Sequence, residues 1–319
     1  MTVEIKALES NNTWTLVPLP AEKQCIGCRW VYKASINFSD TFSPVAKLTS
    51  IRVLLAVVAT KNWSILQLDL DNAFLNGDLF EEVYMELPKG YNSVDKTLVC
   101  RLKKSLYGLR QAFRQWFCKF STTLIGNGFS QLKNDYYLFT IDKGASLVIL
   151  LVYVDDILLA GLSVACVHSI QAKLQALFKL KIHGPLKYFL GLEIANSSKG
   201  IVLTQQKYAF SLLEDTGFLG CKPSSLPMDP NLKLNMLNGE LLTDPSMYRR
   251  LLGRLMYLTI SRPDITFVVN KLSQYIQNPR TPHLDVVHHL LQYIKGTLGQ
   301  GLHFQPNNYF NLSAYADAN

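Results

Sequence analysis

A nearly unbroken apolar run from Ser146 to Gly161, SLVILLVYVDDILLAG, carries two adjacent aspartates, Asp155 and Asp156. An ionised carboxylate in apolar surroundings is costly unless it is paired or binds a metal ion. A transmembrane helix would bury both charges at roughly 2.5 to 3.5 kcal/mol each, which argues against that interpretation. The run must therefore fold so that the acidic pair reaches solvent or a cation.

The residue types of this run favour two short buried strands, LVILLVYV and ILLAG, joined by a tight turn at the acidic pair. Valine, isoleucine and tyrosine are common in strands, and aspartate is common in turns. The flanking residues are Val154 and Ile157, however, so no glycine is present to supply a positive φ. On these residues alone, a plain turn and a cation site explain the pair equally well.

A third aspartate lies near the end of an earlier strand. In the segment 65–70, ILQLDL, the odd-numbered side chains lie on one side and the three leucines on the other, because strand side chains alternate. Asp69 is therefore expected at the end of this strand. The preceding segment, Ser50–Lys61, predicts a buried helix with Ser50 as its N-cap.

A basic segment separates the two acidic positions. Arg101–Lys119, RLKKSLYGLRQAFRQWFCK, has six basic residues and no acidic one, and four aromatic residues are interleaved with them: Tyr107, Phe113, Trp116 and Phe117. Such a mixture suits phosphate contact together with base or sugar stacking. A solvated basic helix face is the alternative, but the position between two acidic clusters favours a surface that handles phosphate.

The remaining patterns predict further elements along the chain. Hydrophobic periodicity indicates a helix over 166–178, strands over 185–194 and 201–204, and a helix over 205–216. Prolines and asparagines between 223 and 238 are typical of a linker, so the main domain is expected to end near 225. Helices over 245–257, 264–277 and 283–296 and an incipient strand over 311–319 complete the series.

The charge and cysteine content of the 319 residues indicate the partner and the setting. A formal charge of +8 and a pI near 9.1 favour an acidic partner, of which nucleic acid is the commonest. Six scattered cysteines, no signal peptide and no apolar segment long enough to span a bilayer are typical of a reducing intracellular compartment. We therefore expect an intracellular, cytoplasmic protein.

Several motifs together resemble the reverse transcriptases of copia-type long-terminal-repeat retrotransposons. Tyr153-Val154-Asp155-Asp156 resembles the family's Y-x-D-D signature, and QLDLDNAFLNGDL (67–79) is similar to the segment with its first catalytic aspartate. Six more segments match Pol polyproteins of this group in the family's order: NTWTLVPLP, IGCRWVYK, TFSPVAKLTSIR, SLYGLRQAFRQW, PLKYFLGLEI and SRPDITFVVNKLSQY. The resemblance covers nearly the entire chain.

This resemblance implies an α+β fold with the right-hand architecture of polymerases. Residues 1–225 would form the fingers and a palm with an antiparallel sheet, residues 226–310 a mainly helical thumb and connection region, and residues 311–319 the truncated start of a ribonuclease H domain.

The implied function is RNA-directed DNA synthesis on an RNA or DNA template-primer from deoxynucleoside triphosphates. Two Mg²⁺ ions, or Mn²⁺ in their place, would be held by the catalytic Asp69, Asp155 and Asp156 and by the Leu70 carbonyl, since Mg²⁺ prefers oxygen ligands. The resemblance and the basic segment assign Phe74, Gln111 and Tyr153 to the nucleotide, and Arg101, Lys103, Lys104, Arg110, Arg114, Tyr188 and Gly191 to the nucleic acid. Phe74 matches the bulky residue that excludes a 2′-hydroxyl.

The chain departs from the family at three places. Only ASINFSD lies between Lys33 and Thr41, so the fingers are shortened near 34–41, where relatives carry a longer basic insert. Phe113 replaces the family's proline, and the sequence stops at Asn319, after Tyr315-Ala316-Asp317 but before further ribonuclease H carboxylates. We therefore expect no ribonuclease H activity from this polyprotein fragment. The alternative to a polymerase is a catalytically inactive nucleic-acid-binding remnant.

Overall fold

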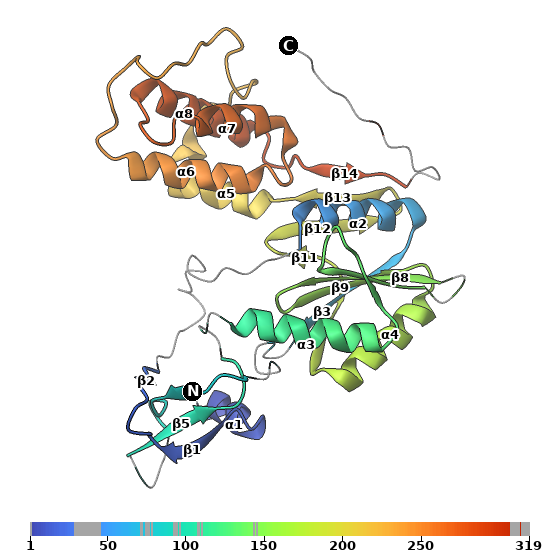
Figure 1. Ribbon diagram of the computed structural model, residues 1–319. Helices are drawn as coiled ribbons and strands as arrows, with labels where there is room; N and C mark the ends of the chain where they lie inside the picture. The colour runs from blue at the N-terminus through green and yellow to red at the C-terminus, as the bar shows by residue number, and fades with distance from the viewer. Residues whose placement is uncertain are drawn as a thin grey trace. The chain divides into compact units, whose positions relative to one another are not determined.

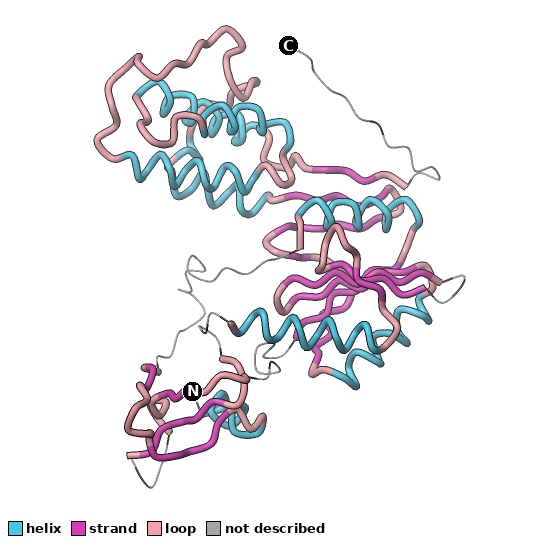
Figure 2. The backbone as a smooth tube through the Cα atoms, viewed as in Figure 1, coloured by secondary structure: helices cyan, strands magenta, loops and turns pink. Residues whose placement is uncertain are grey.

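The computed structural model describes residues 2–28, 46–70, 73, 77, 79–91, 95, 97–106, 109, 111–142, 144, 146–306 and 313. Contacts divide the chain into two compact units: unit 1 comprises Met1–Ile51 and Trp63–Pro185, and unit 2 comprises Arg52–Asn62 and Leu186–Asn319. Figure 1 and Figure 2 show strands throughout unit 1 and a cluster of helices in unit 2. The expected α+β class is confirmed, and nearly all strand pairs are antiparallel.

A six-stranded antiparallel sheet is the centre of unit 1. Its strands, in spatial order, are β10 (Leu180–Pro185), β3 (Ser64–Leu70), β9 (Asp156–Gly161), β8 (Leu147–Tyr153), β7 (Leu138–Asp142) and β6 (Ser130–Gln131). The predicted hairpin is therefore confirmed as β8 and β9, and the predicted strand 65–70 is β3. Valine, isoleucine and leucine suit these central strands because their side chains are buried against neighbours.

Two helices, α3 (Ala112–Gly126) and α4 (Val164–Leu177), pack against this sheet (Figure 1). The fully buried Trp116 and Phe120 of α3 contact the ring of Phe178, which follows α4, at centroid distances of 5.7 and 4.9 Å. Phe120 also meets Phe139 of β7 edge-on. Trp116 of the basic segment and Phe120 just after it thus form core between helix and sheet.

A smaller sheet lies near the N-terminus of unit 1. It follows α1 (Thr2–Ser10) and has the order β1 (Trp14–Pro18), β5 (Leu98–Leu102), β4 (Tyr84–Met85) and β2 (Cys25–Ile26), with β2 parallel to β4. Its own core comprises Leu8, Trp14, Leu79, Met85, Cys100 and Leu102.

Unit 2 combines a four-stranded antiparallel sheet with a bundle of helices. The sheet consists of β11 (Tyr188–Phe189), β12 (Leu192–Ser197), β13 (Gly200–Thr204) and β14 (Leu302–Phe304). The helices are α5 (Gln206–Asp215), η4 (Phe218–Gly220), α6 (Pro245–Leu258), η5 (Pro263–Ile265), α7 (Thr266–Ser273) and α8 (Thr281–Gly296). No helix in the described ranges is long and apolar enough to cross a bilayer.

The predicted helix over 50–61 is α2 (Leu48–Lys61), but Ser50 is not its N-cap. The helix begins before this serine, whose hydroxyl donates to the Asp135 carboxylate at 2.5 Å. Asp135, which is 6% exposed, also accepts the Lys47 amide at 3.0 Å. A carboxylate distant in sequence therefore satisfies the donors at this helix terminus, a role that local spacing could not reveal.

Three other expectations differ from the structure in detail. The strand expected over 185–194 is interrupted between β11 and β12, where Leu190 and Gly191 take φ values of 53° and 74°. The helix expected over 264–277 is divided into η5 and the shorter α7, which ends at Ser273. The stretch 223–238 is irregular, as a linker would be, but it lies inside unit 2, so the expected boundary near 225 does not coincide with the division of contacts.

Two expectations concern residues that the structure does not describe. The shortened segment 34–41 lies outside the described ranges, and so does the expected strand over 311–319 with its Asp317, apart from Ser313.

Candidate active site

The pairing of β3 with β9 brings the predicted carboxylates together. Asp69 and Asp156 are direct partners across the two antiparallel strands, so their side chains share one face of the sheet. Asp155 lies in the turn before β9, and its carbonyl accepts the Leu70 amide at 2.8 Å. The register therefore places all three aspartates and the Leu70 backbone at one end of these strands.

The turn between β8 and β9 is strained. Tyr153 pairs with Asp156 across it, which leaves Val154 and Asp155 as its two central residues. Val154 has a φ of 59°, a left-handed conformation that is exceptional for a β-branched residue. The sequence has no glycine here to supply a positive φ, and Val154 itself takes that conformation.

A buried tryptophan donates a hydrogen bond to the strained turn. The indole Nε1 of Trp116, on α3, donates to the Val154 carbonyl at 3.3 Å. Strained backbone of this kind persists where surrounding contacts over-determine it, and it clusters at functional sites. The predicted role of Trp116 and Phe113 in base stacking is wrong, since both are buried, at 0% and 8% exposure.

The surroundings of Asp156 raise the pKa of its carboxyl group. Burial is the main cause that raises its pKa, and the neighbouring charges of Asp155 and Asp69 raise it further. The Gln67 amide, which donates to Asp156 Oδ1 at 3.2 Å, and His183 oppose this rise. Crowded carboxylates with a raised pKa are typical of functional sites because they create a demand for positive charge.

The sequence analysis missed His183 as a neighbour of the carboxylates. Its Nε2 lies 3.8 Å from Asp69 Oδ2, at a register shift of β10 between Ile182 and Gly184. Lys181 is the direct partner of Asp69 across β10 and β3. A strand prediction extended to 180–185, where LKIHGP alternates, would have placed both residues at the site.

The donor chemistry of the site suits a hard divalent cation, since carboxylate and carbonyl oxygens are the ligands that Mg²⁺ prefers. The mutual repulsion of Asp69, Asp155 and Asp156 would also be relieved by such an ion. Within the described ranges, however, no three or more histidine, cysteine, aspartate or glutamate side chains are already arranged to hold a metal. The residues therefore fit the ion by type and by charge, without a complete set of ligands in place.

The other predicted residues fall into three groups. Tyr153, at the end of β8, lies directly beside Asp156, and burial raises its pKa. Gln111 precedes α3, and its amide donates to Glu81 at 2.7 Å. Phe74 and Arg110 lie outside the described residues.

The predicted nucleic-acid contacts are spread over both units. In unit 1, Arg101, Lys103 and Arg114 are exposed, and Lys104 is half-buried. Tyr188 and Gly191 belong to unit 2, where Lys207 lies over the Tyr188 ring at 4.9 Å and the Tyr257 hydroxyl donates to the Leu190 carbonyl at 2.5 Å.

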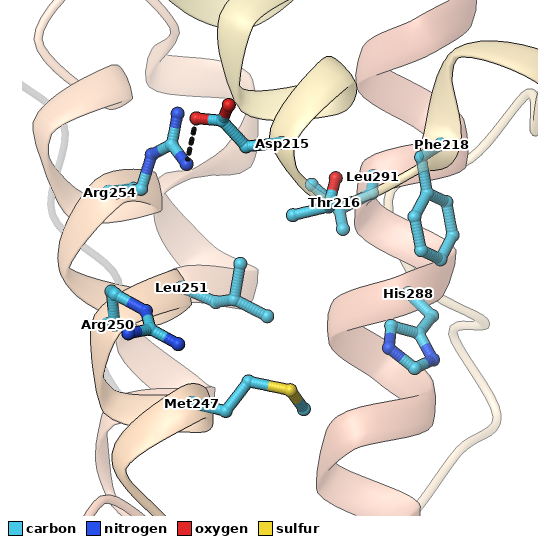
Figure 3. Close-up of a pocket in the computed structure, with 9 residues that line it drawn as sticks. All are labelled: Asp215, Thr216, Phe218, Met247, Arg250, Leu251, Arg254, His288 and Leu291. Carbon is cyan, nitrogen blue, oxygen red and sulfur yellow. Dashed lines mark ion pairs between the residues drawn. The ribbon is translucent and has the colours of Figure 1, made fainter.

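A cavity of about 470 Å³ lies elsewhere, among α5, η4, α6 and α8 of unit 2. Figure 3 shows Arg254 and Asp215 joined as an ion pair at one end of it, and the distance between Arg254 Nη1 and Asp215 Oδ2 is 2.9 Å. Its lining residues are Asp215, Thr216, Phe218, Met247, Arg250, Leu251, Arg254, His288 and Leu291. None of the predicted site residues is among them, so this cavity is separate from the carboxylate site.

Comparison with known families gives a match over most of the chain. The family model described as reverse transcriptase (RNA-dependent DNA polymerase) matches residues 33–230. The Retrovirus-related Pol polyprotein from transposon RE1 of Arabidopsis thaliana is 40% identical over all of this chain and 24% of its own length. The Pol polyprotein from transposon TNT 1-94 of Nicotiana tabacum is 34% identical over all of this chain and 26% of its own length.

A shorter relative covers a similar region. The putative transposon Ty5-1 protein of Saccharomyces cerevisiae is 30% identical over 79% of this chain and 82% of its own length. The chain spans about a quarter of the two plant polyproteins that it matches.

Proposed function

Because the chain belongs to the reverse transcriptase family of copia-type Pol polyproteins, we propose that it is an RNA-directed DNA polymerase. The observation that carries this proposal is the register of β3 and β9, in which Asp69 lies opposite Asp156 with Asp155 in the adjoining turn. Its substrates are a template-primer of RNA or DNA and deoxynucleoside triphosphates.

In this proposal Asp69 and Asp155 hold two Mg²⁺ ions, with Asp156 and the Leu70 carbonyl as further oxygen donors. Bound Mg²⁺ supplies charge stabilisation for the attacking and leaving oxygens of an in-line displacement. The Trp116 indole keeps the turn in place from the Val154 carbonyl, and Gln67 orients Asp156. These contacts hold the acidic groups rigidly, as a catalytic site requires.

The remaining assignments follow from the same proposal. Tyr153, Phe74 and Gln111 contact the incoming nucleotide, with Phe74 excluding a 2′-hydroxyl. The nucleic acid is bound by Arg101, Lys103, Lys104, Arg110, Arg114, Tyr188 and Gly191. The six-stranded sheet corresponds to the palm and the helices of 226–310 to the thumb and connection region.

Primer extension with the purified chain tests the proposal. We expect Mg²⁺-dependent extension of a DNA primer on an RNA template, weaker with EDTA and supported by Mn²⁺. Asp155→Asn should abolish extension because it removes a metal ligand without changing side-chain size. Asp142→Asn, at an exposed carboxylate that ends β7, is the matched control and should leave extension unchanged.

The alternative is a nucleic-acid-binding protein without polymerase activity. It is favoured by one observation: the alignment with the transposon RE1 polyprotein has 344 positions, so this relative has residues that the 319-residue chain lacks. Binding and extension measurements together distinguish the two functions. Binding of template-primer that is unchanged by Asp155→Asn, with no extension by the unsubstituted chain under any metal, would overturn the polymerase proposal.

A further inference from the structure

Phe80 is the most exposed large apolar side chain in the described ranges, at 86%. It lies at the edge of a cavity of about 320 Å³ in unit 1. The cavity is lined by Thr15, Leu79, Phe80, Glu81, Glu82, Arg101, Leu102 and Lys103. A single exposed phenylalanine is unremarkable by itself, but an aromatic ring beside such a charged cavity is not an ordinary solvent-exposed face.

Backbone hydrogen bonds fix the segment that carries Phe80. The Leu79 amide donates to the Lys103 carbonyl at 3.0 Å, and the Leu102 amide donates to the Val83 carbonyl at 2.9 Å, so the segment 79–83 runs beside the end of β5. Leu79 and Leu102 are both buried in the core of the small sheet. The ring of Phe80 is therefore displayed by rigid neighbours rather than by a loose loop.

The carboxylates of the cavity are already oriented by donors. Glu82 lies 3.2 Å from Lys23 and 3.4 Å from Arg101, and it accepts the Tyr84 hydroxyl at 3.1 Å. Hydrogen bonds from Lys23 and Tyr84 are the main causes that lower the pKa of Glu82. Glu81 accepts the Gln111 amide at 2.7 Å.

Cationic and acceptor groups thus line the same cavity as the exposed Phe80 ring. Lys103 and Arg101 line the same cavity as the two glutamates, and Lys23 is bound to Glu82. An apolar ligand would make no polar contact with these charged groups, whereas a nucleotide offers groups that can contact each of them. Its base presents a π-face and N–H donors, and its phosphate presents negative charge.

We propose that Phe80, Arg101, Lys103 and Glu81 bind an unpaired nucleotide of a single-stranded nucleic acid. The base stacks on Phe80, the phosphate contacts Arg101 and Lys103, and the Glu81 carboxylate accepts from amino or imino groups of the base edge. The site rests on the proposed function, because a polymerase requires an unpaired template strand. It adds two residues, Phe80 and Glu81, to which neither the motifs nor the basic segment assigned a role.

Fluorescence anisotropy tests the site without catalysis. The probes are a fluorescein-labelled single-stranded DNA of mixed sequence and a strand of equal length with abasic sites, both without divalent cations or nucleotides. Phe80→Ala should weaken binding of the mixed strand by about fivefold or more, since stacking contributes roughly 1–3 kcal/mol per base. Its affinity for the abasic strand and its dependence on salt should not change, and Phe80→Trp should restore binding of the mixed strand.

Phe267→Ala is the matched control, because Phe267 is 71% exposed but lies in unit 2. It should bind both strands like the unsubstituted chain. The inference is wrong if Phe80→Ala binds the mixed strand normally, or if it loses affinity for both strands equally. Free deoxyguanosine monophosphate serves as a third probe. The inference is also wrong if Phe80→Ala weakens the binding of this mononucleotide but not of the mixed strand, since the site would then bind a free nucleotide.

The binding test and the primer-extension test can fail separately. Phe80-dependent binding by a chain that does not extend primers would overturn the proposed polymerase and support this site. Extension by a chain whose strand binding ignores Phe80 would overturn this site alone.

Discussion

Val154 shows how a single residue marks the site. A β-branched residue with a φ of 59° is strained, and the tight turn between β8 and β9 would be easier for glycine. The strain is held by pairing on both sides and by the hydrogen bond from Trp116. Its position, directly before Asp155 and Asp156, connects it to the carboxylates rather than to the core.

Replacing Val154 should therefore relieve strain. We expect Val154→Gly to stabilise unit 1 by about 1 kcal/mol, because strain of roughly 1–3 kcal/mol is removed and glycine loses about 0.5–1 kcal/mol of backbone entropy. The thermal midpoint should rise by about 2–4 °C in differential scanning calorimetry. Val152→Gly, at a buried residue of β8 that is 1% exposed, should instead lower it. A lower midpoint for Val154→Gly would contradict the presence of strain.

Asp156 gives a prediction about pH. Its pKa is raised mainly by burial, so its ionised form is the less stable one in the fold. Stability should fall as pH rises from the ordinary aspartate value of about 3.9 through the raised pKa, and stay level above it. Asp156→Asn should therefore raise the urea midpoint at pH 7, with a benefit that shrinks towards pH 4.

Two comparisons make this prediction specific. Asp142→Asn, at an exposed residue, should leave the urea midpoint nearly unchanged at both pH values. Added Mg²⁺ should stabilise the unsubstituted chain more than Asp156→Asn, since the ion relieves the repulsion that the substitution has already removed. Equal midpoints for the Asp156→Asn and unsubstituted chains at pH 7 would refute the destabilising effect of this ionised carboxylate.

At the scale of elements, a buried arginine ties together the segments of unit 2. Arg262, which is 2% exposed, donates to Asp264 at 2.9 and 2.7 Å and to the carbonyl and hydroxyl of Thr297 at 3.0 and 2.8 Å. The Tyr293 hydroxyl donates to the same aspartate. Burial alone would raise the pKa of Asp264, but these hydrogen bonds outweigh it and lower the pKa. The network joins η5 to the end of α8.

Breaking this network should be costly. Arg262→Ala leaves the Asp264 carboxylate, whose side chain is 33% exposed, and the Thr297 carbonyl without their donor. We therefore expect a loss of about 1.5–3 kcal/mol in urea denaturation. Arg262→Lys should recover only part of it, because an ammonium cannot reproduce the planar fork. Arg250→Ala, at an exposed residue of α6, should change stability by less than about 0.5 kcal/mol. If both alanine variants unfold alike, the network is not a source of stability.

Elements also show where patterns succeed and fail. Long periodic segments such as α6 and α8 were predicted from their apolar spacing, because helix burial follows that spacing directly. The short strands β4 and β14 were not predicted, since two or three residues carry little periodicity. The N-terminal α1 was not predicted either. The start of α2 was misjudged because Asp135, far away in sequence, satisfies its first donors.

At the scale of the whole molecule, motif order was enough to identify the family. The Y-x-D-D motif, the segment with Asp69 and six further segments are local strings, and their resemblance needs no knowledge of contacts. The family match over 33–230 agrees with them. The α+β class was expected because the resemblance carried by these motifs implies it, and the structure has that class.

Only the tertiary structure shows which residues are neighbours across strands and which are buried. The register of β3 and β9 places Asp69 opposite Asp156, and that of β10 adds Lys181 and His183. Burial turned Trp116 from an expected stacking residue into the support of a strained turn, while Phe80, unnoticed in the sequence, became an exposed ring beside a charged cavity. The sequence by itself determined the residue types and the local periods, but register, burial and strain arise only when distant segments pack together.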